Sequence, residues 1–365
     1  MYKIENPNHI IRSLKSFVVP VVSVLLAAAA GAVILAISGT DPAAAYKALL
    51  KGAFGDLPSF SRTLEKATPL ILNGLAVALA LRAGLFNIGT QGQLLFGALA
   101  SAVVGFSFQN LPPLVHIPFA MIAGIAAGGL YGVIQGALKA YTGAHEVITG
   151  IMFNYIAINI TDYLANGPFR DTSPGNIIAR TPLISEMSYL SDVMGIPAGF
   201  LICLIAAAIV WLIFKSTVIG FEIKTVGSGI NAARYSGIRI KVILIITMLT
   251  SGALAGLGGA IETQGIVHRF QPGFNIGLGF EGITIALLGR IHPFGIIPAA
   301  ILFGAMKSGA GLMQFTVDVK TEIIDVIQAL ILFFVAADLL VERIIPGVTG
   351  KREKMTLSTG WGGEA

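Results

Sequence analysis

Long apolar segments, separated by polar and charged connections, restrict the fold of this chain more than any other feature. Hydrophobic residues make up 55% of its 365 residues and charged residues only 12%, against about 25% charged residues in a soluble domain. About 20 apolar residues cross the hydrocarbon core of a bilayer as one helix. We therefore predict an all-α polytopic membrane protein with about ten transmembrane helices. The predicted spans are Phe17–Ser38, Leu64–Leu81, Phe86–Phe106, Leu114–Leu138, Val147–Ala165, Ala198–Phe214, Val242–Glu262, Phe274–Leu288, Phe294–Met313 and Ile323–Val341.

The distribution of Lys and Arg predicts how these spans are oriented. With the amino terminus inside, the inner connections hold about twice as many Lys and Arg as the outer ones, the bias typical of cytoplasmic loops. An even number of spans then places both termini in the cytoplasm of a bacterial-type plasma membrane. The predicted parts are a cytoplasmic segment (1–16), a transmembrane domain (17–342) with a surface helix and loop (41–65), an extracytoplasmic loop (166–197), a cytoplasmic loop (215–241), and a cytoplasmic tail (343–365).

One stretch, Leu85–Gln93, is far more polar than the apolar segments on either side of it. Amide and hydroxyl side chains alternate there with Gly89 and Gly92, which allow the chain to leave helical geometry. At membrane depth such groups are tolerated only where protein buries them or they line a cavity. We interpret the stretch as a broken or re-entrant helix that builds a transport site. A short polar loop at the membrane surface is the alternative.

Mostly uncharged polar side chains from this stretch and from later spans define a predicted substrate pathway. They are Asn87, Thr90, Gln91, Gln93, Asn154, Asn159, Glu281 and Thr284. Apart from Lys307, Glu262 and Glu281, almost no fixed charge lies within the spans. A neutral polar solute therefore finds many hydrogen-bond partners, whereas an ion finds little compensation for its lost hydration. Nucleosides and monosaccharides both fit this pathway, and an amino-acid zwitterion fits less well.

Two spans carry glycines at helical spacing, Gly124, Gly128, Gly132 and Gly136 in one and Gly252, Gly256 and Gly259 in the other. Small residues on one face let a neighbouring backbone approach closely, so we predict helix packing there. A lining role for Gln135 is the lesser alternative.

A faint internal repeat is also present in the sequence. Leu75–Arg82 resembles Ile283–Arg290, and Leu95–Ser101 resembles Leu302–Ser308, at nearly equal separations. A parallel duplication of helices would produce this pattern. Chance similarity between apolar segments is the alternative.

No enzyme signature stands out in the sequence. The five histidines lack metal-ligand spacing, and there is no GxxxxGK[ST] phosphate loop, so a separate chain would have to hydrolyse any ATP. Cys203, within an apolar run, is interpreted as inert packing.

The net charge of +5 comes from scattered loop residues and implies no nucleic acid. An ion-coupled secondary transporter is a distant alternative, because ionisable groups near the midplane are lacking; an intramembrane hydrolase would need a nucleophile and base that the spans do not offer.

The inner loop contains a short segment suited to docking a partner. Asn231 is a residue type that caps helices, and the residues after it favour a short helix that Gly237 can end. Arg234 and Tyr235 belong to the types enriched at interface hot spots. A plain solvated loop is the alternative.

The same segment carries a family resemblance. Asn231-Ala232-Ala233, three residues and then Gly237 resemble the Glu-Ala-Ala-x-x-x-Gly signature of ABC importer permeases, with Asn in place of Glu. Four longer segments resemble one permease family, which serves branched-chain amino acids, simple sugars and nucleosides. They are Leu81–Ser101, His145–Ala157, Ser251–Glu262 and Gly279–Gly311. The likeness is to the nucleoside and simple-sugar branch, in which Asn, Thr and Asp are usual where His145, Gly150 and Glu281 stand here.

The resemblance implies the permease subunit of an ATP-binding-cassette importer rather than an enzyme. Its expected partners are cytoplasmic ABC ATPase subunits that bind ATP and Mg²⁺, a second permease that is identical or homologous, an extracytoplasmic substrate-binding lipoprotein, and membrane lipid. This chain itself is expected to hold no cofactor and no metal. The family branch favours nucleosides as substrates, and simple sugars or branched-chain amino acids remain alternatives. The segment Asn231, Ala232, Ala233, Arg234, Tyr235 and Gly237 is the expected contact with the ATPase.

Overall fold

The computed structural model describes residues 8–274, 277–320 and 322–336, and these fold into thirteen α-helices and one short hairpin. The helices are α1 (Asn8–Ile37), α2 (Pro42–Phe54), α3 (Leu57–Arg82), α4 (Thr90–Ser107), α5 (Pro113–Thr142), α6 (Glu146–Asn166), α7 (Ala198–Ser216), α8 (Val218–Ser228), α9 (Ile230–Tyr235), α10 (Ile240–Glu262), α11 (Leu278–Leu288), α12 (Pro293–Val317) and α13 (Glu322–Ala336). A 3-10 turn (η1, Glu186–Ser188) precedes the antiparallel strands β1 (Asp192–Val193) and β2 (Ile196–Pro197), and a π-helical turn (η2, Thr263–Val267) continues α10.

All ten predicted spans fall on helices, which confirms the predicted fold class. Among the described residues, seven helices are long and apolar enough to cross a bilayer: α1, α3, α5, α6, α7, α10 with η2, and α12. The remaining three predicted spans lie on α4, on α11, which has only 11 residues, and on α13, whose predicted end at Val341 lies outside the described residues. The predicted tail, 343–365, also lies outside them.

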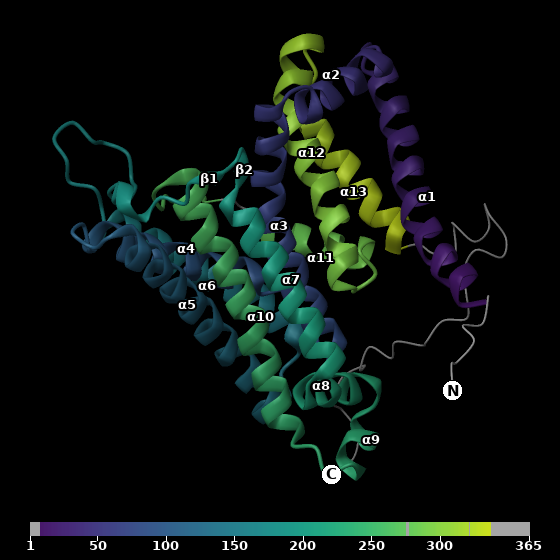
Figure 1. The fold of residues 1–365 in the computed structure, drawn as a ribbon, viewed down its shortest axis with the longest axis vertical. Helices are drawn as coiled ribbons and strands as arrows, with labels where there is room; N and C mark the ends of the chain where they lie inside the picture. Colours follow the sequence, from purple (N-terminus) through teal and green to yellow (C-terminus); the bar gives the residue numbers. More distant parts are fainter. Residues whose placement is uncertain (1–7, 275–276, 321, 337–365) are drawn as a thin grey trace.

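Helix α3 lies within the bundle, most of the other helices form two groups around it, and α7 packs against α3 and α12 (Figure 1). Every residue of α3 from Ala67 to Leu81 is buried. Helices α4, α5, α6 and α10 pack together on one side of it, and α11 and α12, with α1, α2 and α13, pack on the other. The α8–α9 segment lies at one end of the long helices and the β1–β2 hairpin near the opposite end, so the two long predicted loops are at opposite ends of the molecule (Figure 1).

The predicted glycine packing joins α5 to α10. A methyl group added at Gly128 or Gly132 would meet the backbone of α10, and one added at Gly252 or Gly256 would meet the backbone of α5. Gly259, one turn further along α10, faces the backbone of α4 at Leu94 in the same way. The two glycine series are therefore a backbone-to-backbone seam, as the spacing predicts.

Several helix starts differ from the sequence prediction, and those of α3 and α4 have a local cause. Helix α3 begins at Leu57 rather than Leu64, because Asp56 caps it: its Oδ1 accepts a hydrogen bond from the Ser59 backbone N–H at 2.7 Å. Most of the predicted surface segment 41–65 is therefore helical, as α2 and the first turns of α3. Helix α4 begins at Thr90 rather than Phe86, because the chain between Arg82 and Thr90 leaves helical geometry.

The two halves of the predicted repeat occupy comparable places in the fold. Leu75–Arg82 closes α3, and Ile283–Arg290 spans the end of α11 and the two residues after it. The second matched pair lies within α4 and within α12. Each half is thus a helix, a turn at an arginine, and a second helix, which is the arrangement that a duplication would leave.

Candidate translocation and coupling sites

The break between α3 and α4 is stabilised by its own backbone and then buried. Gly84 adopts a left-handed conformation with φ of 74°, and the Leu85 N–H donates to the Ala80 carbonyl at 3.1 Å. The polar side chains that follow, Asn87, Thr90, Gln91 and Gln93, are each 1% exposed or less. The alternative of a polar surface loop is therefore wrong, because protein covers the whole stretch. The break has the buried, non-helical character of a discontinuous membrane helix.

A chain of side-chain hydrogen bonds runs from this break to α5 and α10. Asn87 Nδ2 donates to Gln93 Oε1 at 3.0 Å and to Ser251 Oγ, on α10, at 2.8 Å. Gln93 Nε2 donates to Gln135 Oε1, on α5, at 2.9 Å, and Ser251 Oγ donates to the Ala76 carbonyl of α3 at 2.7 Å. Gln135 is therefore a partner of the predicted pathway residues, although its sequence position favours a plain packing helix.

Helix α6 contributes one asparagine to the same cluster. Asn154 Oδ1 accepts from the Gly92 N–H at 2.9 Å, and its Nδ2 donates to the Ile88 carbonyl at 2.9 Å. One side chain thus satisfies two backbone groups of the break, which cannot bond within a helix. Asn159, on the same helix, is exposed and donates only to its own helix at the Tyr155 carbonyl, 2.7 Å away. The structure brings Asn154 into the cluster and leaves Asn159 out.

Helix α11 meets the same break from the other side. Gln91 Oε1 accepts from the Gly279 N–H at 2.8 Å, and Thr90 Oγ1 donates to the Gly279 carbonyl at 3.0 Å. Thr284 is buried in the same short helix. We call Asn87, Thr90, Gln91, Gln93, Gln135, Asn154, Ser251 and Gly279 the amide cluster. It joins α4, α5, α6, α10 and α11 through uncharged groups.

Two ion pairs lie close to this cluster along the chain. Glu281, two residues beyond Gly279, accepts from Lys307 of α12, with Oε1 and Nζ 2.7 Å apart. Lys139, one helical turn beyond Gln135, pairs with Glu146 at 2.7 Å, and both side chains are largely buried. Each of these two pairs therefore places opposite charges side by side, and the amide cluster itself contains no charged side chain.

The coupling segment consists of two short helices, α8 and α9, at one end of the bundle. Ile223 and Val226 of α8 and Ala233 of α9 are buried against Ile243 at the start of α10. On the opposite side of α9, Arg234 is exposed and Tyr235 is 94% exposed. Asn231 and Ala232 are exposed as well. The segment is therefore anchored by Ala233 and presents the other predicted contact residues to a partner.

One prediction for this segment is wrong and another is confirmed. Asn231 does not cap α9, because the helix already begins at Ile230, and its N-cap residue, Gly229, has no side chain to bond the first N–H groups. Gly237 does end the helix: it has φ of 74°, and its N–H donates to the Arg234 carbonyl at 3.1 Å.

The long loop at the opposite end is held by local bonds and packs on the start of α3. Ser173 Oγ donates to Asp171 Oδ1 at 2.6 Å, and this hydrogen bond, with a second from the Ser173 N–H, lowers the pKa of Asp171. The Asp171 N–H donates to the Arg180 carbonyl at 2.8 Å. A methyl group at Gly195, between the two strands, would lie 3.4 Å from Leu57 Cδ2. The loop and the α2–α3 corner therefore form one continuous surface.

A helical membrane bundle with a broken centre held by amide side chains, and an exposed helix at one end, is the architecture of a transport permease. Over residues 59–336 the chain matches the family described as branched-chain amino acid transport system / permease component. The chain belongs to this family.

Characterised relatives cover nearly the whole chain. The guanosine ABC transporter permease protein NupP of Bacillus subtilis is 39% identical over 94% of this chain and 99% of its own length. The nucleoside ABC transporter permease protein NupB of Lactococcus lactis is 37% identical over 91% of this chain and 94% of its own. A glucose ABC transporter permease protein of Haloferax volcanii is 31% identical over 95% of this chain and 94% of its own. The chain is thus a transport subunit of the ABC type.

Proposed function

We propose that this chain is the translocating permease of an ABC importer for nucleosides. The observation that carries the substrate class is the similarity to permeases named for guanosine and for nucleosides, each over more than nine-tenths of this chain. The neutral amide cluster supports it, because amides can both donate to and accept from the hydroxyls and ring atoms of an uncharged solute. A charged solute would lose its hydration there without an opposite charge to replace it.

The pathway is proposed to pass the amino terminus of α4, where Asn87, Thr90, Gln91 and Gln93 meet α6 and α11. These side chains are bonded to one another in the structure described here, so a passing solute exchanges its hydrogen bonds for theirs with little net gain. The permease site is accordingly weak and permissive, and a partner protein makes the selection. Glu281 and Thr284 of α11 line the same route; Asn159, exposed on the outer face of α6, would reach it only from the second permease.

Docking of the ATPase is proposed at α9, with Arg234 and Tyr235 as the contact residues and Ala233 as the anchor. An exposed tyrosine beside an exposed arginine on a helix fixed to the bundle is the arrangement expected at an interface hot spot. ATP and Mg²⁺ bind on that partner. The α8–α9 end then faces the cytoplasm of a bacterial-type plasma membrane, and an even number of spans returns the carboxy terminus to the same side.

The opposite end is proposed as the landing surface for an extracytoplasmic binding lipoprotein. The loop over residues 166–197 and the corner over residues 41–62 meet there, and together they present a broad polar surface. A second permease, identical or homologous, completes the pathway across the outward faces of the bundle, which membrane lipid covers elsewhere.

Competition for uptake tests the substrate class. Cells that depend on this chain take up labelled guanosine, and excess uridine, glucose or leucine is added in separate arms. We expect inhibition by uridine and none by glucose or leucine. The glucose permease relative makes a sugar the second candidate, so inhibition by glucose, or no guanosine uptake at all, would replace the nucleoside assignment.

A further inference from the structure

Helix α8 touches the break between α3 and α4 through bare backbone. Gly227, in the last turn of α8, lies so close to the end of α3 that a methyl group on it would overlap the Arg82 carbonyl oxygen. Gly84 faces Gly227 across the same contact: a methyl group there would lie 3.5 Å from the Gly227 Cα. No side chain separates the two segments at this point, so a movement of α8 toward the 82–84 turn displaces that turn directly.

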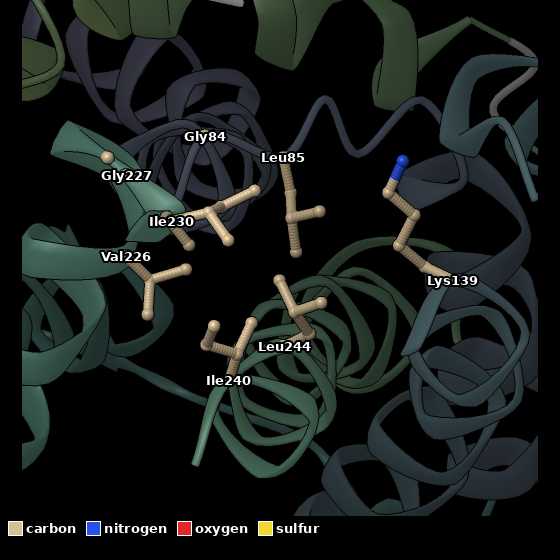
Figure 2. A pocket seen from close by; sticks show the side chains of 10 residues that line it. Gly84, Leu85, Lys139, Val226, Gly227, Ile230, Ile240 and Leu244 are labelled. Carbon is tan, nitrogen blue, oxygen red and sulfur yellow. The ribbon is translucent and has the colours of Figure 1, made fainter. Parts of the chain in front are cut away.

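Beside this contact the packing is open. A cleft of about 100 Å³ separates α9 from the helix ends opposite it. Figure 2 shows Ile230 of α9 and Leu85 of the break on one side, with Ile240 and Leu244 of α10 below them and Lys139 of α5 at the far edge. Close backbone contact at Gly227 and empty space in front of Ile230 are what a pivot requires, since α9 can tilt into the cleft and turn the end of α8 about Gly227 against the 82–84 turn.

The turn at Arg82 links this pivot to three other parts of the bundle. Arg82 Nη2 and Nε donate to the Ile291 carbonyl at 3.0 and 3.3 Å, and the guanidinium lies over the Phe214 ring of α7, 5.7 Å from its centroid. Arg290 and Ile291 are consecutive residues with φ of 53° and 55°. This left-handed conformation is strained for the β-branched Ile291, so the surrounding contacts must stabilise it. Five residues beyond Arg82, Asn87 begins the amide cluster.

We propose that Gly227 is the pivot through which the coupling helix moves the α3–α4 break, with Arg82 carrying the same motion to the α11–α12 turn. This rests on the proposed docking of an ATPase at α9. Gly227 and Arg82 are positioning residues: they touch neither the solute nor the ATPase, and they set how far the break follows α9. The amide cluster is then rearranged from its α4 end, where Asn87 is continuous with the moving turn.

A matched pair of glycine substitutions tests the pivot. Gly227→Ala inserts a methyl group between α8 and Arg82, whereas Gly311→Ala, in α12, inserts one where nothing lies within 4 Å. Each variant is purified with its ATPase, reconstituted in proteoliposomes with the binding protein, and assayed for subunit stoichiometry, guanosine-stimulated ATPase activity and uptake. We expect Gly227→Ala to keep normal stoichiometry and basal hydrolysis, while stimulation and uptake fall at least about tenfold, a coupling loss of about 1.4 kcal/mol. Equal stimulation and uptake in the two variants would overturn the pivot.

A reversible cross-link tests the motion even where Gly227→Ala fails to fold. Ile230→Cys and Ile240→Cys, in a Cys203→Ser background, place two thiols across the cleft. A cleavable bifunctional maleimide should stop uptake, and reduction should restore it in the same preparation; the single Ile230→Cys variant with the same reagent is the control. Uptake at the same rate before and after reduction, with the cross-link confirmed by mass, would overturn the proposal. Absence of a co-purified ATPase in the unsubstituted protein would instead remove the docking on which it rests.

Discussion

Asn154→Leu tests whether the amide cluster holds the break between α3 and α4 together. Leucine branches at Cγ as asparagine does, but it is larger and forms no hydrogen bonds, so the Gly92 N–H and the Ile88 carbonyl, each 2.9 Å from the asparagine amide, both lose their partner. A buried backbone group left unpaired costs about 1–3 kcal/mol. Within a membrane the lower part of that range applies, because the unfolded chain also finds other partners. For the two unpaired groups together, we expect the free energy of unfolding to fall by about 2–3 kcal/mol.

Asn159→Leu is the control on the same helix. Asn159 is exposed and bonds only to its own helix, so its loss should cost no more than about 0.5 kcal/mol, as for most surface positions. At about 2–4 °C per kcal/mol, Asn154→Leu should lower the melting temperature by about 4–12 °C, measured as the loss of the monodisperse peak on size exclusion after heating. Hydrogen exchange should rise over residues 83–95 in this variant alone. Equal melting temperatures and equal exchange for the two variants would refute the reasoning.

Three further substitutions test the coupling segment, the orientation and the pathway. Arg234→Glu should abolish co-purification of the ATPase and uptake, since reversing an interface charge costs several kcal/mol; normal subunit stoichiometry with normal uptake would show that α9 is not the docking helix. Ser191→Cys, exposed beside β1, should react with an impermeant maleimide on intact cells in a Cys203→Ser background; labelling seen only after lysis would reverse the orientation. Gln91→Leu should slow guanosine uptake and leave the ATPase bound, because Gln91 faces α11 and not α9; wild-type uptake at matched membrane levels would take Gln91 out of the pathway.

The spacing of residues along a helix predicts a contact when only one packing geometry is compatible with that spacing. The glycines of α5 recur every four residues and those of α10 every three or four, which places each series along one face of its helix, so close packing follows from the sequence. Asn154 and Asn159 illustrate the opposite case. They are five residues apart, which turns the second about 140° away from the first around the helix. The two residues are of the same type, and which of them faces inward is decided by the position of α4 in the folded bundle.

Gln135 shows the same limit across a longer distance. It stands within a glycine-rich helix and is a packing residue by every local criterion, yet its partner, Gln93, lies 42 positions earlier in the chain. The helix cap at Asn231 fails for a different reason. A residue type that suits a cap is only a tendency, and here α9 begins at Ile230 with Gly229 as its N-cap, two residues before Asn231.

The glycine seam between α5 and α10 also orders the biosynthesis of the protein. More than a hundred residues separate Gly136 from Gly252, so at about 5–20 residues per second the ribosome needs about 5–20 seconds to supply the second half of the seam. During that interval Gly128 and Gly132 of α5 lack the α10 backbone that they meet in the folded structure, although α4 has already been made. A nascent chain arrested between the two helices therefore lacks α10, the helix on which both α4 and α5 pack.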